Sequence, residues 1–455
     1  MPERNEKNIV LFVSTLCSFF SAFMLSAVTI AVPAIGTEFS MNAVWLNWVS
    51  ISFLLTSTVL LVPFSKLADK YGYKKIFLIG NIVSIAFIAV TPLSQSTVPF
   101  IILRLLSGIG GAMATVTGMA MVTSAFPTNE RGRAIGITLA AVYFGISVGP
   151  FLGGFLTEYW GWRSVFWAPV PFLLFAAIIM LWKMKSEWTH PYEGKFDWAG
   201  AIIYGISLTG LLYGLSLLPE LIGLWIVIAS IIGVLAFIWI ETRTKNPVME
   251  INLFRKSRLF AFSNLAALIS YSATMSIAFL LSLYLQYNRG MSASEAGLVL
   301  VAQPLLQAIF SPFAGRFSDR MEPVYLASMG IGINAVGLVC LALTGANTPI
   351  WFIIIGTLIM GVGSALFVSP NTNAIMGTVD KSMYAAANAT LSTMRQLGGM
   401  VSQAIIMVAF ALIIGQVEIT PQYYGAFLTS MKIVFSISAG LCFIGIFLSL
   451  ARGKR

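Results

Sequence analysis

The sequence predicts an all-α integral membrane protein with about fourteen transmembrane helices, and three observations support this fold class. First, 58% of its 455 residues are hydrophobic and only 10% are charged, whereas a soluble domain carries roughly 25% charged residues. Second, apolar runs of about 20 residues, the length that crosses a bilayer, recur along the whole chain. Third, Lys and Arg are concentrated in alternate connections between these runs.

The length rule for a transmembrane helix places the spans one by one. The first run, about 9–34, exceeds the 7–15 apolar residues of a signal-peptide core, so we expect it to be a retained span. The seventh and eighth spans are separated only by residues 218–222. The spans are expected near residues 9–34, 44–64, 75–94, 98–122, 134–157, 163–182, 198–218, 222–240, 259–286, 295–315, 323–344, 349–370, 388–415 and 428–450.

The distribution of basic residues predicts the orientation. With the amino terminus in the cytoplasm, 23 of the 27 Lys and Arg fall in cytoplasmic segments, and only Arg163, Arg289 and Lys432 fall on the outer side. Cytoplasmic loops are the ones that carry excess Lys and Arg. The sequence therefore predicts a multi-pass protein of the cell membrane with both termini in the cytoplasm.

A short repeat indicates duplicated halves. Residues 65–70 (S-K-L-A-D-K) follow the second span, and residues 315–320 (G-R-F-S-D-R) follow the tenth. Both read small, basic, apolar, small, Asp, basic, at the same topological place. We therefore expect a six-helix bundle at 1–190, an inserted two-helix linker at 191–245 and a second six-helix bundle at 246–455.

The composition excludes several kinds of site. His190 is the single histidine, and the three cysteines lie inside apolar runs, so no metal site, disulfide framework or cofactor is expected. The net charge of +10 resides in short connections between spans, where it orients a membrane protein, and does not predict nucleic-acid binding. We expect a monomer surrounded by lipid.

Three stretches carry unusual residues within or next to spans. Asp69 lies at a cytoplasmic helix end, where a carboxylate can accept N–H groups from a neighbouring helix start or pair with nearby cations. Gly72 permits a tight reversal. Arg104 lies inside the fourth span, where its cost of about 2.5 kcal/mol or more predicts an internal partner, unless the side chain extends to the interface.

The fifth span contains glycines at every fourth position: Gly145, Gly149 and Gly153. They form a smooth face for close helix approach, and Pro150 removes a backbone donor and bends the helix. Such a face serves static packing, or the movement of one bundle against the other.

These stretches together resemble the major facilitator superfamily, and more closely its fourteen-helix drug:proton antiporter family. L-A-D-K-x-G-x-K-K from residue 67, R-L-L-S-G-I-G-G-A from residue 104 and G-x-x-x-G-P-x-x-G-G from residue 145 resemble its motifs near the second, fourth and fifth helices. R-Q-L-G-G from residue 395 also falls where this family has similar residues. The resemblance implies two bundles that rock about a central site. It leads us to expect gating or coupling roles for Asp69, Gly72, Arg104, Gly145, Gly149, Pro150, Gly153, Asp319 and Arg395.

One departure concerns the first helix. Aligned on Pro33, Met24 and Thr29 stand where many drug-exporting relatives have an acid and an amide. All 17 acidic residues lie in connections or near span ends; Glu158 and Glu295 come closest to the interior. We therefore expect a cavity that is polar without being acidic, with candidate lining residues Asn47, Tyr143, Asn264, Gln286, Gln303, Gln307 and Asn373.

The resemblance implies a secondary active transporter that exports small lipophilic or drug-like compounds, with protons as the expected coupling partner. The missing first-helix acid and Arg104 leave an alternative open, in which the same fold moves one dedicated metabolite, lipid or anion without proton coupling. A polytopic membrane enzyme is a third hypothesis. It is disfavoured because Asp69 and Asp319 stand alone and no His is available to join them.

Overall fold

The computed structural model describes residues 4–188, 197–244, 254–255, 257–379 and 384–453, and every regular element in that part of the chain is helical. Fourteen helices within it are long and apolar enough to cross a membrane. The predicted fold class and number of spans are confirmed. The expected domain boundaries after residues 190 and 245 lie outside the described residues.

The N-half contains the first six spans. Its elements are α1 (Arg4–Glu38), α2 (Ala43–Tyr71), α3 (Tyr73–Val90) with a 3-10 turn η1 (Thr91–Leu93), α4 (Thr97–Ala125), α5 (Thr128–Trp160), and the consecutive helices α6 (Arg163–Trp167) and α7 (Val170–Lys183).

The C-half contains the last six spans, after the linker helices α8 (Trp198–Ser216) and α9 (Leu221–Glu241). Several of its spans consist of consecutive helical segments. Its elements are α11 (Arg258–Thr274), α12 (Ile277–Leu283), the π-helix η2 (Tyr284–Asn288), α13 (Ala293–Leu300), α14 (Ala302–Arg320), α15 (Pro323–Ala342), α16 (Ile350–Met376), α17 (Tyr384–Ala409), the π-helix η4 (Phe410–Ile414), the 3-10 turn η5 (Pro421–Tyr423) and α18 (Tyr424–Ala451).

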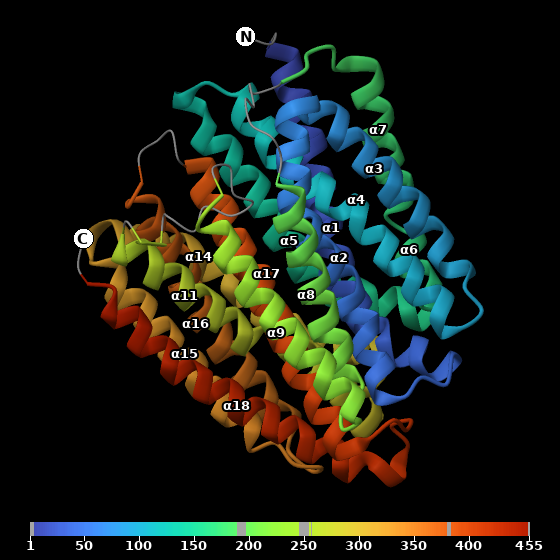
Figure 1. Cartoon of the computed structure of the whole chain (residues 1–455). Coiled ribbons are helices and arrows are strands. Elements are labelled where there is room, and N and C mark those ends of the chain that lie inside the picture. The colour runs from blue at the N-terminus through green and yellow to red at the C-terminus, as the bar shows by residue number, and fades with distance from the viewer. Residues whose placement is uncertain (1–3, 189–196, 245–253, 256, 380–383, 454–455) are drawn as a thin grey trace.

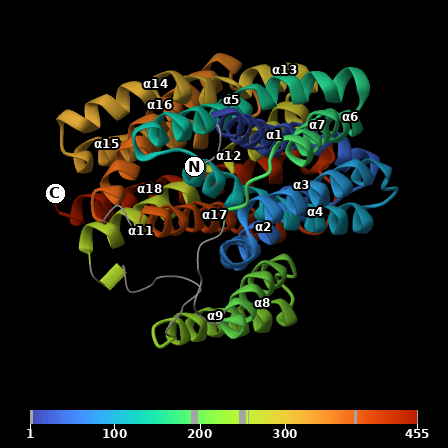
Figure 2. The same ribbon diagram turned by 90° about the horizontal axis from the view of Figure 1, so that it is seen from above.

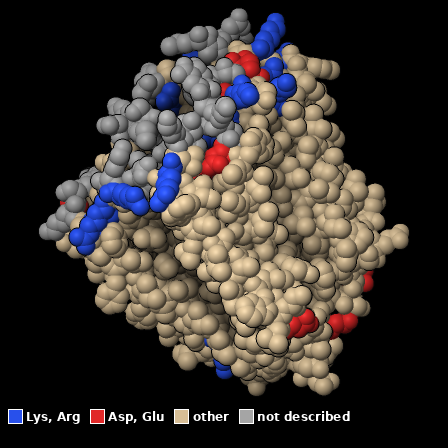
Figure 3. All heavy atoms as spheres, viewed as in Figure 1, with Lys and Arg blue, Asp and Glu red and all other residues tan. Residues whose placement is uncertain are grey.

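The two halves lie side by side, and the α8–α9 pair packs on the outside of α2 and α17 (Figures 1 and 2). We call the end at which α1 begins and α18 ends the termini face, and the opposite end the distal face. Most exposed Lys and Arg in the view of Figure 3 gather toward the termini face, above and beside a broad uncharged surface. This surface is the part of the molecule that suits lipid.

Several helices are longer than the predicted spans. The predicted span 44–64 becomes the 29-residue α2, about 43 Å long at 1.5 Å per residue, against a hydrocarbon core of about 30 Å. Residues 65–70 therefore form the last turns of a helix, and residues 315–320 likewise end α14. Only Gly72 separates α2 from α3, with a φ of +104° that favours glycine.

Glycine contacts repeat between the halves. A Cβ at Gly110 of α4 would lie 2.5 Å from Gly80 O of α3, and a Cβ at Gly330 of α15 would lie 2.6 Å from Gly363 O of α16. Gly330 follows Gly80 by 250 positions, the same offset as the two repeated hexapeptides. The helix pairs α3–α4 and α15–α16 are therefore equivalent.

A second pair of contacts extends this equivalence. A Cβ at Gly145 of α5 would lie 2.5 Å from Phe19 O of α1, and a Cβ at Gly398 of α17 would lie 2.5 Å from Leu268 O of α11. Gly145 belongs to the fifth-span motif, and Gly398 belongs to R-Q-L-G-G. The two motifs thus perform the same packing in the two halves, which supports an ancient duplication.

Candidate functional site

A seam between α1 and α12–η2 joins the halves in the distal part of the molecule. Pro33 has no N–H, so the carbonyl of Thr29 one turn earlier lacks its helical donor. Ser282 Oγ donates to Thr29 O at 3.0 Å, and Gln286 Nε2 donates to Ile30 O at 3.0 Å. Gln286, expected to line the cavity, therefore bonds across this seam.

Helix α5 meets α13 in the same distal part, with direct backbone contact. A Cβ at Gly154 would lie 2.3 Å from Ala293 O, and a Cβ at Gly297 would lie 2.2 Å from Pro150 O. Glu158 Oε2 accepts a hydrogen bond from Ser294 N at 3.0 Å. The contact of α5 with α14, nearer the termini face, is much smaller. The halves are therefore held together mainly toward the distal face.

Helices α2 and α17 form the third contact between the halves. Asn47 Nδ2 donates to Gln403 O at 2.9 Å, and Thr58 Oγ1 donates to Gln396 Oε1 at 2.9 Å. Asn47 is fully buried. Its amide is thus part of this α2–α17 contact, although the sequence suggested a cavity position.

The glycine face of α5 packs within the N-half. A Cβ at Gly149 would lie 2.7 Å from Ser26 Cβ, and a Cβ at Gly153 would lie 2.7 Å from Ala27 Cα. Pro150 leaves the carbonyl of Ile146 without its helical donor, and Ser26 Oγ donates to it at 3.0 Å. The face formed by Gly145, Gly149 and Gly153 thus fixes α5 on α1, and its neighbours Gly154 and Pro150 form the contact between the halves.

Four polar side chains from both halves meet near the middle of the molecule. Arg395 Nη2 in α17 donates to Thr372 Oγ1 in α16 at 2.9 Å, and the guanidinium lies over the Tyr271 ring of α11, 5.7 Å from its centroid. Tyr143 of α5 interacts electrostatically with Tyr271 and Arg395. All four side chains are partly exposed. We call this set the central group: Tyr143, Tyr271, Thr372 and Arg395.

Four other predicted lining residues lie in the C-half. Gln303 and Gln307 are partly exposed, one turn apart along α14. Asn264 is fully buried and donates to Phe260 O of its own helix at 2.9 Å. Asn373 Nδ2 donates to Ser318 Oγ at 2.8 Å, which joins α16 to α14. In this conformation the two glutamines are therefore better placed than the two asparagines to meet a ligand.

Arg104 is enclosed in the N-half with an internal partner. It is 4% exposed, and its Nε and Nη2 lie 3.3 and 3.2 Å from Val49 O of α2. Its guanidinium also lies over the rings of Phe53 and Phe166, at 5.4 and 5.8 Å. This burial confirms the predicted internal partner and excludes extension to the interface. Arg104 therefore anchors α4 to α2.

At the termini face, Asp69 accepts a hydrogen bond from the Tyr73 hydroxyl at 2.7 Å. Among the described residues it forms no ion pair with Arg131 or Arg133. The side chain of Asp319, its counterpart in the repeat, lies outside the described residues. The free N–H groups of a neighbouring helix start, which were expected to bind Asp69, donate instead to another acid.

That acid is Glu187, in the segment after α7. Its Oε1 accepts from Lys74 N at 2.8 Å, and its Oε2 accepts from Lys75 N at 3.2 Å, so it satisfies free N–H groups of α3. Glu6 of α1 holds the same segment by accepting from Ser186 N at 2.6 Å. The segment after α7 is thus hydrogen-bonded to the start of α3, next to the α2–α3 turn. No local sequence motif predicts this contact.

The interior is poor in acidic groups. Every described Asp or Glu lies in a connection or within two turns of a helix end. The ion pair found in the described part of the chain, Glu38 with Arg163, lies at the distal face. Among the residues that the structure describes, no group of three or more His, Cys, Asp or Glu could hold a metal ion. In the described part of the chain, no carboxylate therefore belongs to the middle of a spanning helix.

Arg452 is a buried cation in a segment that the Lys and Arg distribution assigns to the cytoplasm. It is 2% exposed at the end of α18, and its Nη1 donates to Asn371 Oδ1 at 2.8 Å and to Ser263 Oγ at 3.1 Å. Its Nη2 donates to Pro323 O at 3.2 Å. Burial lowers the pKa of Arg452 to about 10, so it stays charged at neutral pH and joins three helix ends of the C-half.

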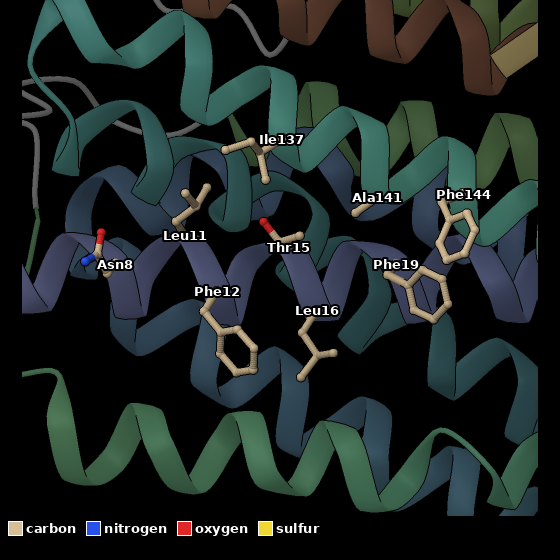
Figure 4. A pocket seen from close by; sticks show the side chains of 9 residues that line it. All are labelled: Asn8, Leu11, Phe12, Thr15, Leu16, Phe19, Ile137, Ala141 and Phe144. Atoms are coloured by element: carbon tan, nitrogen blue, oxygen red, sulfur yellow. The ribbon is translucent and has the colours of Figure 1, made fainter. Parts of the chain in front are cut away.

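A groove of about 480 Å³ lies away from the central group, between α1 and α5 (Figure 4). Among its lining residues, Phe12, Ile137 and Phe144 are exposed apolar side chains, and Thr15 Oγ1 lies 3.5 Å from Thr138 Oγ1. The remaining lining is mostly apolar. Its lining includes no charged side chain and no member of the central group.

Comparison with known proteins agrees with this architecture. The sequence profile of the Major Facilitator Superfamily matches residues 14–242 and 263–454. A solved bacterial homologue of the human lysosomal transporter Spinster, in an inward-facing and unoccupied conformation, superposes with a TM-score of 0.72 and 16% sequence identity. The match covers 99% of this chain and 98% of that one. At this identity, the likeness describes the fold alone.

Curated relatives span most of the chain. The riboflavin transporter RibZ of Clostridioides difficile is 27% identical over 98% of this chain and 97% of its own. The multidrug resistance protein Stp of Mycobacterium tuberculosis is 28% identical over 88% of this chain and 76% of its own. The tetracenomycin C resistance and export protein of Streptomyces glaucescens is 27% identical over 86% and 73%.

Proposed function

Because this chain belongs to the major facilitator superfamily and is a secondary transporter rather than an enzyme, we propose that it exports small lipophilic, drug-like compounds across the cell membrane by alternating access. The observation that carries the proposal is the central group, whose members come from membrane-spanning helices of both halves. Arg395 contacts Thr372 and the Tyr271 ring, and Tyr143 of α5 lies within electrostatic range of Tyr271 and Arg395. Rocking of the halves would expose such a site to each side in turn.

The proposed orientation places the termini face in the cytoplasm. The distribution of Lys and Arg supports it, because cytoplasmic loops carry the excess of these residues. The contacts between the halves gather toward the distal face. In this orientation the outer side is closed, and the central group is reached from the cytoplasm. An exporter loads its substrate in this state.

Proton antiport is the second part of the proposal. No carboxylate lies at mid-membrane among the described residues, so a coupling group must come from elsewhere. Glu158 bonds Ser294 N across the closed seam and would lose that bond when the seam opens. Its affinity for a proton would then differ between the two states, as coupling requires.

Purified protein in proteoliposomes tests both parts. We expect accumulation of several chemically unrelated aromatic compounds, riboflavin and tetracenomycin C among them, with release of protons reported by a pH-sensitive dye. Equal accumulation in liposomes with and without protein would refute export. Accumulation with no change in internal pH, in wild type and in Glu158→Gln alike, would refute coupling and leave export standing.

A second candidate is transport of one dedicated aromatic metabolite. Its support is that the riboflavin transporter matches nearly the whole of both chains and that Met24 replaces the first-helix acid of many drug exporters. Competition separates the two functions. If a single compound class is transported and unrelated compounds do not compete, the dedicated function holds.

A further inference from the structure

Arg395 uses fewer of its hydrogen-bond donors than the buried Arg104 and Arg452 do. A guanidinium has five N–H donors. Two nitrogens of the buried Arg104 donate to the carbonyl of Val49, and Arg452 donates to three acceptors. Arg395 has one hydrogen bond, to Thr372, and its Nε is buried without an acceptor.

The position of Arg395 matters because N–H donors without acceptors are costly inside a membrane-spanning helix. It lies eleven residues into α17, about 16 Å from the helix start at 1.5 Å per residue, and within the membrane-spanning segment Ala387–Ile414. Charged groups at this depth face partners or a path for the substrate. No carboxylate contacts Arg395 among the described residues, yet the side chain is partly exposed. Its unused donors are therefore available to a ligand.

The surroundings of Arg395 favour a planar aromatic ligand. The guanidinium lies over the Tyr271 ring, 5.7 Å from its centroid, and Tyr143 of the other half lies within electrostatic range of Arg395. Aromatic side chains bind flat rings by offset stacking or edge contacts. Neighbouring residues hold α17 in place, because Gln396 accepts from Thr58 and Gly398 packs on α11. The cation is thus held on a well-packed helix, over one tyrosine ring and within electrostatic range of a second tyrosine.

We propose that Arg395 binds an anionic oxygen of the substrate, so that the preferred substrates are aromatic compounds with a carboxylate or another acidic oxygen. The proposal rests on the transport function given above and names its substrate class. A guanidinium and a carboxylate form strong, charge-assisted hydrogen bonds, often two in parallel. A cationic compound would meet Arg395 without a compensating acid, so it should bind poorly.

Three probes of similar shape test the charge preference: 2-naphthoate, 2-naphthylmethanol and 2-naphthylmethylammonium. Their affinities are measured by calorimetry on the purified full-length protein in nanodiscs at neutral pH. We expect the wild type to bind 2-naphthoate about tenfold or more tightly than the ammonium compound, the size of one charge-assisted interaction. Equal affinities, tighter binding of the cation or no binding of 2-naphthoate would overturn the proposal without any variant.

Variants assign the preference to Arg395. Arg395→Gln should weaken 2-naphthoate binding about tenfold and leave 2-naphthylmethanol unchanged, which also reports correct folding; Arg395→Lys should recover part of the loss. Arg243→Gln is the matched control, because Arg243 also lies over an aromatic ring, Trp239 at 4.2 Å, but on the exposed linker. Unchanged 2-naphthoate affinity in folded Arg395→Gln would overturn the proposal.

The outcome also separates this inference from the transport function. If the proteoliposomes transport neutral aromatic compounds and the three probes bind equally, the transport function stands and the anion preference fails. If Arg395-dependent binding of 2-naphthoate occurs without transport of any compound, the anion site stands and the transport function fails.

Discussion

A methyl group at Gly154 should open the distal seam. The added Cβ would lie 2.3 Å from Ala293 O and 2.9 Å from Ala293 C, backbone atoms that move only with α13 itself. Overpacking of this kind costs about 1–3 kcal/mol. The cost applies only while the seam is closed, so Gly154→Ala should change the ratio of open to closed molecules by about 5- to 150-fold.

Distances between spin labels at the distal face measure this shift. Leu93 of the N-half and Asn347 of the C-half are both exposed there and can carry labels on cysteine, once the native cysteines have been replaced by alanine. We expect Gly154→Ala to move the distance distribution toward longer values. The effect requires no substrate, because the steric conflict is already present in the empty protein.

Gly136→Ala is the matched control. Gly136 lies in the same helix, α5, and a Cβ there would meet nothing within 4 Å. The reasoning is refuted if Gly154→Ala and Gly136→Ala give the same distance distribution, since the backbone contact between α5 and α13 would then not restrain the halves.

Two further predictions concern stability and are checked by thermal unfolding in detergent. Glu187→Ala removes the acceptor of two N–H groups of α3 and should lower the free energy of unfolding by about 1 kcal/mol, whereas Glu418→Ala, in an exposed connection, should have no effect. Arg104→Ala removes two hydrogen bonds to Val49 O and leaves a cavity in a buried site, which should cost about 1–3 kcal/mol, with the exposed Lys432→Ala as control. If a variant unfolds at the same temperature as its control, the stabilising role given to Glu187 or Arg104 is contradicted.

The sequence was sufficient for features that depend on composition or on one strained residue. Fourteen apolar runs predicted fourteen spans. Gly72 predicted the reversal between α2 and α3 because few other residues adopt its positive φ. Burial of Arg104 could be predicted because a cation inside a span needs an internal partner. Each of these inferences uses a property of one residue or one run of residues, without knowledge of its neighbours in the fold.

The central group could not be assembled from the sequence. Tyr271 and Thr372 belong to no motif, and they reach Arg395 only because α11, α16 and α17 pack together. Asn47 and Gln286 were expected in the cavity because they are polar, but polarity does not say which neighbour a helix face meets. Their amides bond backbone carbonyls of the other half.

Locking the distal seam tests alternating access most directly. Glu158 and Ser294 lie on the two sides of the seam and are joined by a hydrogen bond, so cysteines at both positions, in a protein without its native cysteines, should be joined by a short bifunctional methanethiosulfonate. We predict that the cross-linked protein still binds its substrate but no longer transports it down a concentration gradient in proteoliposomes, a readout that needs no proton coupling, and that dithiothreitol restores transport. Undiminished transport by fully cross-linked protein would contradict the rocking of the two halves about the central group.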